Sequence, residues 1–133
     1  MNDLFRENIL EHHRYPRCHG TLDAPDVSIE DANPLCGDHI RMDLRIRDNV
    51  LEQVRFSGQG CSISQAAASM LCEHVEGRTL DEIKALSRQD VLDMLGIDLG
   101  PVRLKCAMLA LKALKSGIWG VQDWPGEEEE GGA

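Results

Sequence analysis

Hydrophobic and polar residues alternate along one stretch of the chain in the pattern of a half-buried strand. Over residues 39–47 every second residue is apolar, and these are Ile40, Met42, Leu44 and Ile46. A period of two places such residues on one face of a sheet. Residues 48–49, Asp-Asn, supply a turn. A returning strand is predicted over residues 50–56, where Val50, Val54 and Phe56 continue the alternation and Glu52 interrupts it. The two strands predict an antiparallel hairpin.

Helical spacing of apolar residues dominates the rest of the chain. Helices are predicted over residues 4–13, 87–95 and 101–117. Another is predicted from near Ser62 or Ser64 to Val75, and a short one opens at Thr79. Thr79 and Glu82 have the spacing of a capping box, and Pro101 occupies a favoured first helical position. A weaker strand pattern passes through Val27 and Ile29. This order of helix, strands and helices predicts an α+β fold with helices on one face of a sheet.

The length and composition fit a single globular domain. The chain has 133 residues, of which 42% are hydrophobic and 28% charged. We assign residues 1–124 to one domain. Residues 125–133 contain the run Glu127 to Glu130 and too few apolar side chains for a core, so a disordered acidic tail is expected there.

The charge and the start of the chain exclude several classes of partner. The net charge is −9, and nonspecific nucleic-acid binding needs a basic face instead. The first residues lack the apolar stretch of a signal peptide, and no window approaches the ~18 apolar residues of a spanning helix. We therefore expect a cytoplasmic protein that binds neither nucleic acid nor membranes.

Five cysteines carry the candidate chemistry, and they are Cys18, Cys36, Cys61, Cys72 and Cys106. An odd number in a reducing compartment argues against a disulfide framework. Cys36 and Asp38 lie at the entrance to the clear strand, and Cys61 follows the returning strand. Paired strands are only ~5 Å apart, so the open end of the hairpin is expected to bring these three residues into one site.

Cys106 is predicted near the start of the last helix, where it follows two cationic residues, Arg103 and Lys105. The helix N-terminus and the two cations favour a thiolate. Thiolates select zinc, copper(I) or iron–sulfur clusters. Asp38 is a harder ligand than a fourth cysteine, so a site that uses it is expected to hold a cluster loosely.

Three segments resemble the ligand segments of the IscU/SufU/NifU-N family of iron–sulfur cluster scaffolds. They are residues 33–38 (NPLCGD), 60–64 (GCSIS) and 102–107 (VRLKCA), and residues 4–17 also resemble the first helix and Pro-Arg turn of that family. The resemblance covers residues 4–119.

The resemblance implies a three-stranded antiparallel sheet packed with helices, and a cysteine desulfurase as partner. It also implies that Cys36, Asp38, Cys61 and Cys106 hold the metal or cluster. Cys106 or Cys61 would be the first sulfur acceptor. Lys105 stands where IscU proteins have a histidine and SufU proteins a lysine. Cys106 follows Cys61 by 45 positions, which is close to the IscU spacing.

The sequence is compatible with two functions. In the first, the protein takes sulfur from the desulfurase and iron from a donor, builds a labile [2Fe–2S] cluster, and transfers it to apo-proteins. In the second, a zinc-bound form accepts sulfur and stimulates the desulfurase without building a cluster. Both describe a scaffold or sulfur carrier, with sulfurtransferase activity in the second, rather than a conventional enzyme. A structural zinc domain would show Cys-x-x-Cys pairs, which the sequence lacks.

The remaining candidates have simpler interpretations. Cys72 is expected in the core and Cys18 in a turn, where an exposed thiol would be open to modification. His39 is expected on the wet face of its strand, with transient ligation as the alternative. Lys105 is expected to be a solvated helix charge, with a direct role in the site as the alternative.

Overall fold

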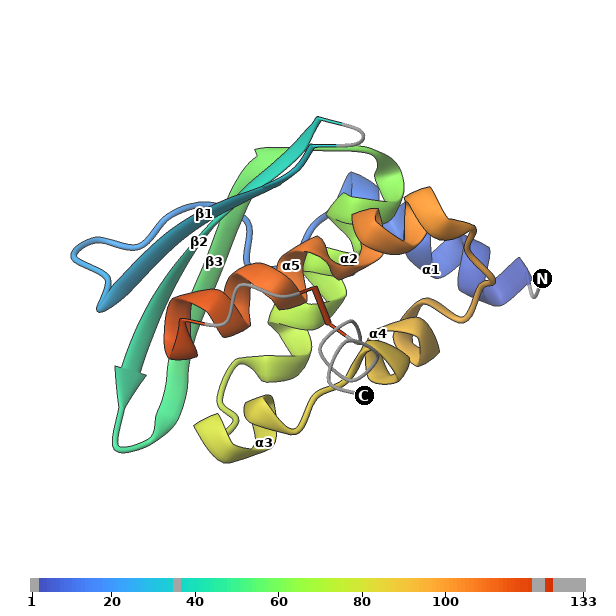
Figure 1. Cartoon of the computed structure of the whole chain (residues 1–133). Helices are drawn as coiled ribbons and strands as arrows, with labels where there is room; N and C mark the ends of the chain where they lie inside the picture. Colours follow the sequence, from blue (N-terminus) through green and yellow to red (C-terminus); the bar gives the residue numbers. More distant parts are fainter. Residues whose placement is uncertain (1–2, 35–36, 121–123, 126–133) are drawn as a thin grey trace.

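The computed structural model describes residues 3–34, 37–120 and 124–125. Its sheet has three antiparallel strands in the order β1-β2-β3, namely β1 (Val27–Asn33), β2 (Asp38–Arg47) and β3 (Val50–Gln59). Helices α2 (Ser62–Val75) and α5 (Pro101–Trp119) pack on one face of this sheet (Figure 1). The predicted α+β fold is confirmed.

The other helices are α1 (Asp3–Arg14), α3 (Leu80–Lys84) and α4 (Arg88–Leu95). Helix α1 packs on α2, and α4 contacts both α2 and α5. The predicted capping box is present at the start of α3. There, the backbone N–H of Glu82 donates to Thr79 Oγ1 at 3.2 Å, and the Thr79 N–H donates to Glu82 Oε1 at 3.3 Å. Pro101 is the first residue of α5, as expected.

The β2–β3 hairpin has the predicted turn and one feature that the alternation did not predict. Asp48 and Asn49 have φ of 53° and 62°, as a two-residue hairpin turn requires. The strand register then shifts, and Glu52 is not paired with any residue in the β2–β3 register. This bulge turns Leu51 into the core, fully buried, where Val50 was expected.

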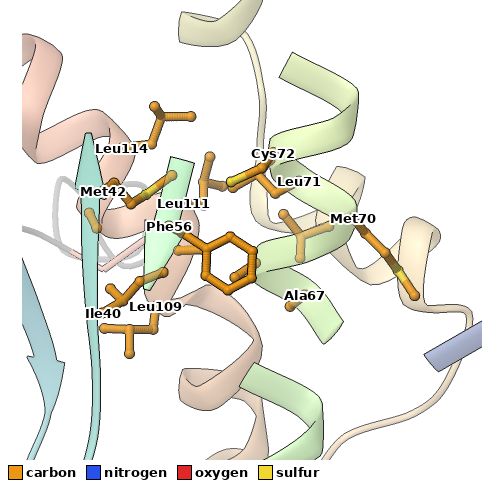
Figure 2. Close-up of a cluster of buried hydrophobic side chains, with 14 of the residues drawn as sticks. Ile40, Met42, Phe56, Ala67, Met70, Leu71, Cys72, Leu109, Leu111 and Leu114 are labelled. Atoms are coloured by element: carbon orange, nitrogen blue, oxygen red, sulfur yellow. The ribbon is translucent and has the colours of Figure 1, made fainter. Parts of the chain in front are cut away.

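The core lies between the sheet and the two long helices. Figure 2 shows Met42 and Phe56 from the strands among side chains of α2 and α5. Met42, Phe56 and Leu111 are fully buried, and each such side chain stabilises the fold by roughly 1.5–3 kcal/mol. Cys72 lies in the same cluster with no exposed surface, which agrees with its expected place in the core.

Helix α5 extends beyond its predicted end at Gly117. It continues to Trp119, and Gly120 follows with a φ of 72°. A Cβ on Gly117 would lie only 3.0 Å from Ile29 Cγ2, so the glycine allows α5 to pack closely on β1. Lys112 Nζ also binds Asp31 Oδ2 at 2.6 Å across this contact.

Trp124 lies against helix α5. The Trp124 ring centre is 5.1 Å from Lys105 Nζ and 5.2 Å from Lys112 Nζ. Pro125 is buried, and residues 126–133 of the expected tail lie outside the described residues, so the tail stays a prediction. Within the described ranges, no helix is both long enough and apolar enough to cross a bilayer.

Candidate metal centre

Asp38, Cys61 and Cys106 come together at one end of the sheet. One ligand atom from each, a carboxylate oxygen or a sulfur, lies within 4.8 Å of the others. Asp38 begins β2, Cys61 directly precedes α2, and Cys106 belongs to α5. The end of β1, the start of β2 and the start of α2 lie at the same end of the molecule in Figure 1. The fourth expected ligand, Cys36, lies outside the described residues.

The open end of the β2–β3 hairpin brings Asp38 to Cys61. The last paired residues are His39 and Gln59, so Asp38 lies beside the chain that leads to Cys61. Asp38 Oδ1 accepts the backbone N–H of Cys61 at 3.2 Å, and the Cys61 thiol lies 3.9 Å from Oδ2. The hairpin geometry predicted from the sequence is therefore present.

Gly60 is needed for this close approach. A Cβ at this position would lie 2.1 Å from Ser64 Oγ and 3.1 Å from Asp38 Oδ1. Ser64 Oγ donates to the carbonyl of Cys61 at 3.1 Å and is itself buried. Any larger residue would displace Asp38 or Ser64, so glycine keeps the carboxylate next to the thiol.

The two described thiols of the site have different surroundings. Cys61 is the N-cap residue of α2 and is half-buried, so the helix dipole favours an anion there. Cys106 is only 3% exposed and lies beyond the first turn of α5, where the dipole effect has fallen off. The sequence predicts that Cys106 benefits from the start of a helix, but in the structure Cys61 occupies such a position.

Asn33 is a site residue whose role no local pattern in the sequence predicts. It is the last residue of β1, it is fully buried, and its side-chain Nδ2 donates to Cys106 Sγ at 3.8 Å. Asn33 is the first residue of the NPLCGD segment, but that segment alone does not indicate what its side chain contacts. Its contact joins residues 73 positions apart, so only the fold could assign it.

The other sequence candidates lie apart from this cluster or at its edge. His39 is exposed on the outer face of the sheet, as expected. Lys105 is half-buried and contacts the Trp124 ring, so it is not a simply solvated charge. Cys18 is half-buried, and burial together with the nearby Glu76 carboxylate raises the pKa of its thiol. The turn thiol is therefore less reactive than a free cysteine.

The donor set of the cluster fits a thiophilic metal. Two sulfurs bound to one zinc ion at ~2.3 Å each lie about 3.8 Å apart in a tetrahedron, so atoms within 4.8 Å need only small movements. Two thiolates and a carboxylate suit zinc or iron rather than magnesium or calcium, which prefer oxygen ligands. The residues present therefore fit the expected metal centre.

The chain matches one protein family and is similar to several known proteins. The family described as "NifU-like N terminal domain" matches residues 4–128. The chain is 30% identical to the zinc-dependent sulfurtransferase SufU of Bacillus subtilis, over 99% of this chain and 95% of the relative. It is 31% identical to the iron-sulfur cluster assembly scaffold protein IscU of Escherichia coli, over 86% of this chain and 91% of the relative.

A solved structure has the same fold. The N-terminal part of a NifU-like protein from Brucella abortus superposes with a TM-score of 0.73, at 23% identity, and the match covers 87% of this chain and 92% of that one. The alignment with SufU spans 149 positions, more than this chain has, so that relative carries residues that this chain lacks.

Proposed function

The chain belongs to the family of NifU-like N-terminal domains, and we propose that it is an iron–sulfur cluster assembly scaffold supplied with sulfur by a cysteine desulfurase. The observation that carries this proposal is the convergence of Asp38, Cys61 and Cys106 from three separate elements. We propose Cys36 as the fourth ligand. Apo iron–sulfur proteins would receive the product. The cytoplasmic location expected from the sequence stays a prediction.

Sulfur transfer would begin with a thiolate of the scaffold. It attacks the terminal sulfur of a Cys–S–SH group on the desulfurase, the S–S bond of that group breaks, and the desulfurase cysteine leaves as a thiolate. The scaffold cysteine becomes Cys–S–SH, and no net oxidation occurs. Cys61 and Cys106 are the two candidate acceptors, and the greater exposure and N-cap position of Cys61 support it as the first.

Cluster assembly then needs iron and electrons. Two persulfide sulfurs require four electrons to become sulfide. Oxidation of two ferrous ions supplies two of these, and a one-electron reductant supplies the others. Three thiolates and the Asp38 carboxylate would leave the [2Fe–2S] product with a net charge of −2. The carboxylate is the weakest ligand for iron, so it supports release to an acceptor protein.

A zinc-bound sulfur acceptor is the second candidate function. It is supported by Lys105, which occupies the SufU-like position, and by the similarity to SufU over nearly the whole chain. In this function Cys36, Asp38, Cys61 and Cys106 would hold a zinc ion, which supplies Lewis acidity that keeps a bound thiol deprotonated. Displacement of one cysteine by the desulfurase would then free a nucleophile.

One experiment separates these functions. The protein is incubated anaerobically with cysteine, a cysteine desulfurase and a reductant, in parallel samples that contain ferrous iron, zinc or neither metal. A visible absorbance that moves to an apo-ferredoxin supports the scaffold, whereas zinc-dependent acceleration of the desulfurase without a chromophore supports the acceptor. Cys61→Ser is expected to abolish either activity. Cys18→Ser, outside the cluster, serves as the matched control and is expected to retain it. If the wild-type protein gives neither result, both proposals are wrong.

A further inference from the structure

Asn33 connects several parts of the metal centre. It pairs with Asp38 across the β1–β2 ladder, and its carbonyl accepts the N–H of Gly37 at 3.0 Å. Gly37 and Asp38, the first described residues after Cys36, are therefore both held to Asn33. Its side chain, from the same residue, extends to Cys106 on α5.

The side-chain amide of Asn33 is fully shielded from solvent. The residue has no exposed surface, and a buried amide has to find its hydrogen-bond partners within the protein. One of these partners is Cys106 Sγ, which accepts from Nδ2 at 3.8 Å and is nearly as buried. Cys61 has no contact of this kind with a side-chain amide among the described residues.

A donor directed at a sulfur changes the chemistry of that sulfur. It stabilises negative charge on a thiolate, reduces its nucleophilicity, and tunes the metal that the thiolate binds. The two described thiols of the centre therefore differ in accessibility and also in hydrogen bonding.

We propose that Asn33 is a positioning residue that donates a hydrogen bond to Cys106 and keeps this cysteine on the metal, while the more exposed Cys61 is left free to react. The inference rests on the proposed metal-binding function and adds a division of labour between the two thiols. Cys106 is the retained ligand, and Cys61 is the ligand that exchanges.

The first test is Asn33→Leu, which keeps the branched shape and the number of side-chain heavy atoms and removes the donor. Zinc affinity is expected to fall about 10-fold to 100-fold, as for the loss of other groups that hydrogen-bond to metal ligands. Alkylation of Cys106 relative to Cys61, measured by mass spectrometry in the zinc-loaded protein, is expected to rise. With cobalt(II) as the probe, the sulfur-to-metal charge-transfer band is expected at longer wavelength, because the sulfur loses a stabilising donor.

The matched control is Ser69→Ala. Ser69 is also fully buried and hydrogen-bonded, but its partners are His12 and the Arg17 N–H, away from the thiols. It is expected to lower thermal stability without shifting the cobalt band or the alkylation ratio. A shift of the same size in Ser69→Ala would assign the effect to general loosening of the fold and overturn the role of Asn33.

A second measurement uses the wild-type protein, so it does not depend on the folding of a variant. With an NMR-active cadmium isotope bound, a scalar coupling between cadmium and the Asn33 side-chain amide proton is expected through the N–H···S bond. Its absence would overturn the inference. If the wild-type protein binds cobalt without any thiolate charge-transfer band, the proposed function fails as well. If the wild-type protein binds metal and Asn33→Leu has the same zinc affinity, alkylation ratio and cobalt band, only the proposed role of Asn33 is wrong.

Discussion

Asp38 contacts Cys61 through both of its carboxylate oxygens. Oδ1 accepts the backbone N–H of Cys61, and Oδ2 lies 3.9 Å from its sulfur. The first contact fixes the loop that leads into α2, and the second places the carboxylate where a metal ligand is expected. Asp38 therefore has a structural role and a proposed ligand role, and these roles can be separated by substitution.

Asp38→Ala is expected to retain a reconstituted cluster longer than the wild type. The carboxylate is the ligand most easily lost from iron, so removing it should remove the preferred route of release. The decay of cluster absorbance and its transfer to an apo-ferredoxin measure this effect. Asp38→Asn, which keeps an acceptor for the Cys61 N–H without the charge, is the control for the structural role. Faster cluster loss in Asp38→Ala would contradict the proposed lability.

Gly60→Ala is expected to weaken zinc binding while the protein stays folded. The added methyl group would overlap Ser64 Oγ and press on the Asp38 carboxylate. Loss of ligand placement should lower zinc affinity by about 10-fold, which competition with a chromophoric chelator measures. Gly100→Ala is the matched control, because a Cβ at Gly100 would meet no atom within 4 Å. Equal affinities in the two variants would show that Gly60 does not position the ligands.

Asp43 is expected to contribute to stability in a pH-dependent way. Burial raises the pKa of its carboxyl, but hydrogen bonds from Ser28 Oγ and the Leu22 N–H, together with Arg41, outweigh burial and hold the pKa below its ordinary value of 3.8. The folded state thus favours the carboxylate. This contribution is fully present above pH 3.8 and is lost as the pH falls through the lower pKa of the folded state.

The corresponding variant is Asp43→Asn. At neutral pH it is expected to lower the free energy of unfolding by about 1–3 kcal/mol, since a buried charged acceptor is removed. As the pH is lowered in steps, the urea midpoint of wild-type unfolding is expected to approach that of Asp43→Asn. A difference that stays constant down to the acid transition would assign the effect to packing alone.

Cys18→Asn is expected to stabilise the protein. Cys18 has a φ of 59°, a left-handed conformation that asparagine adopts more readily than most residues. The gain should be up to about 1 kcal/mol and appear as a higher melting temperature. Cys18→Ala removes the thiol but keeps the unfavourable conformation, so no gain is expected for it. Equal melting temperatures for the two variants would rule out relief of strain as the cause.

Local patterns in the sequence were sufficient to predict most of the fold. The alternation in β2, the turn at Asp48, the capping box at Thr79 and the proline that begins α5 each depend on residues close together in the chain. The meeting of Asp38 with Cys61 could be predicted for the same reason, because a single hairpin joins them.

Features that depend on the exact strand register or on packing between elements could not be predicted in this way. The bulge at Glu52 determines that Leu51, rather than Val50, enters the core. Gly117 resembles a helix terminator in sequence, yet it allows α5 to pack on β1. The contact of Asn33 with Cys106 likewise exists only after β1 and α5 have packed together.

Trp124 provides a built-in optical reporter of the site. The centre of its indole ring lies 5.1 Å from Lys105 Nζ and 5.2 Å from Lys112 Nζ, and Lys105 directly precedes Cys106. Indole fluorescence responds to nearby charge, so displacement of Lys105 by a docking protein or an arriving ion would change the emission. The chain has two tryptophans, and Trp119→Phe would leave Trp124 as the sole emitter. Encounters at this end of α5 could then be followed in real time without an attached dye.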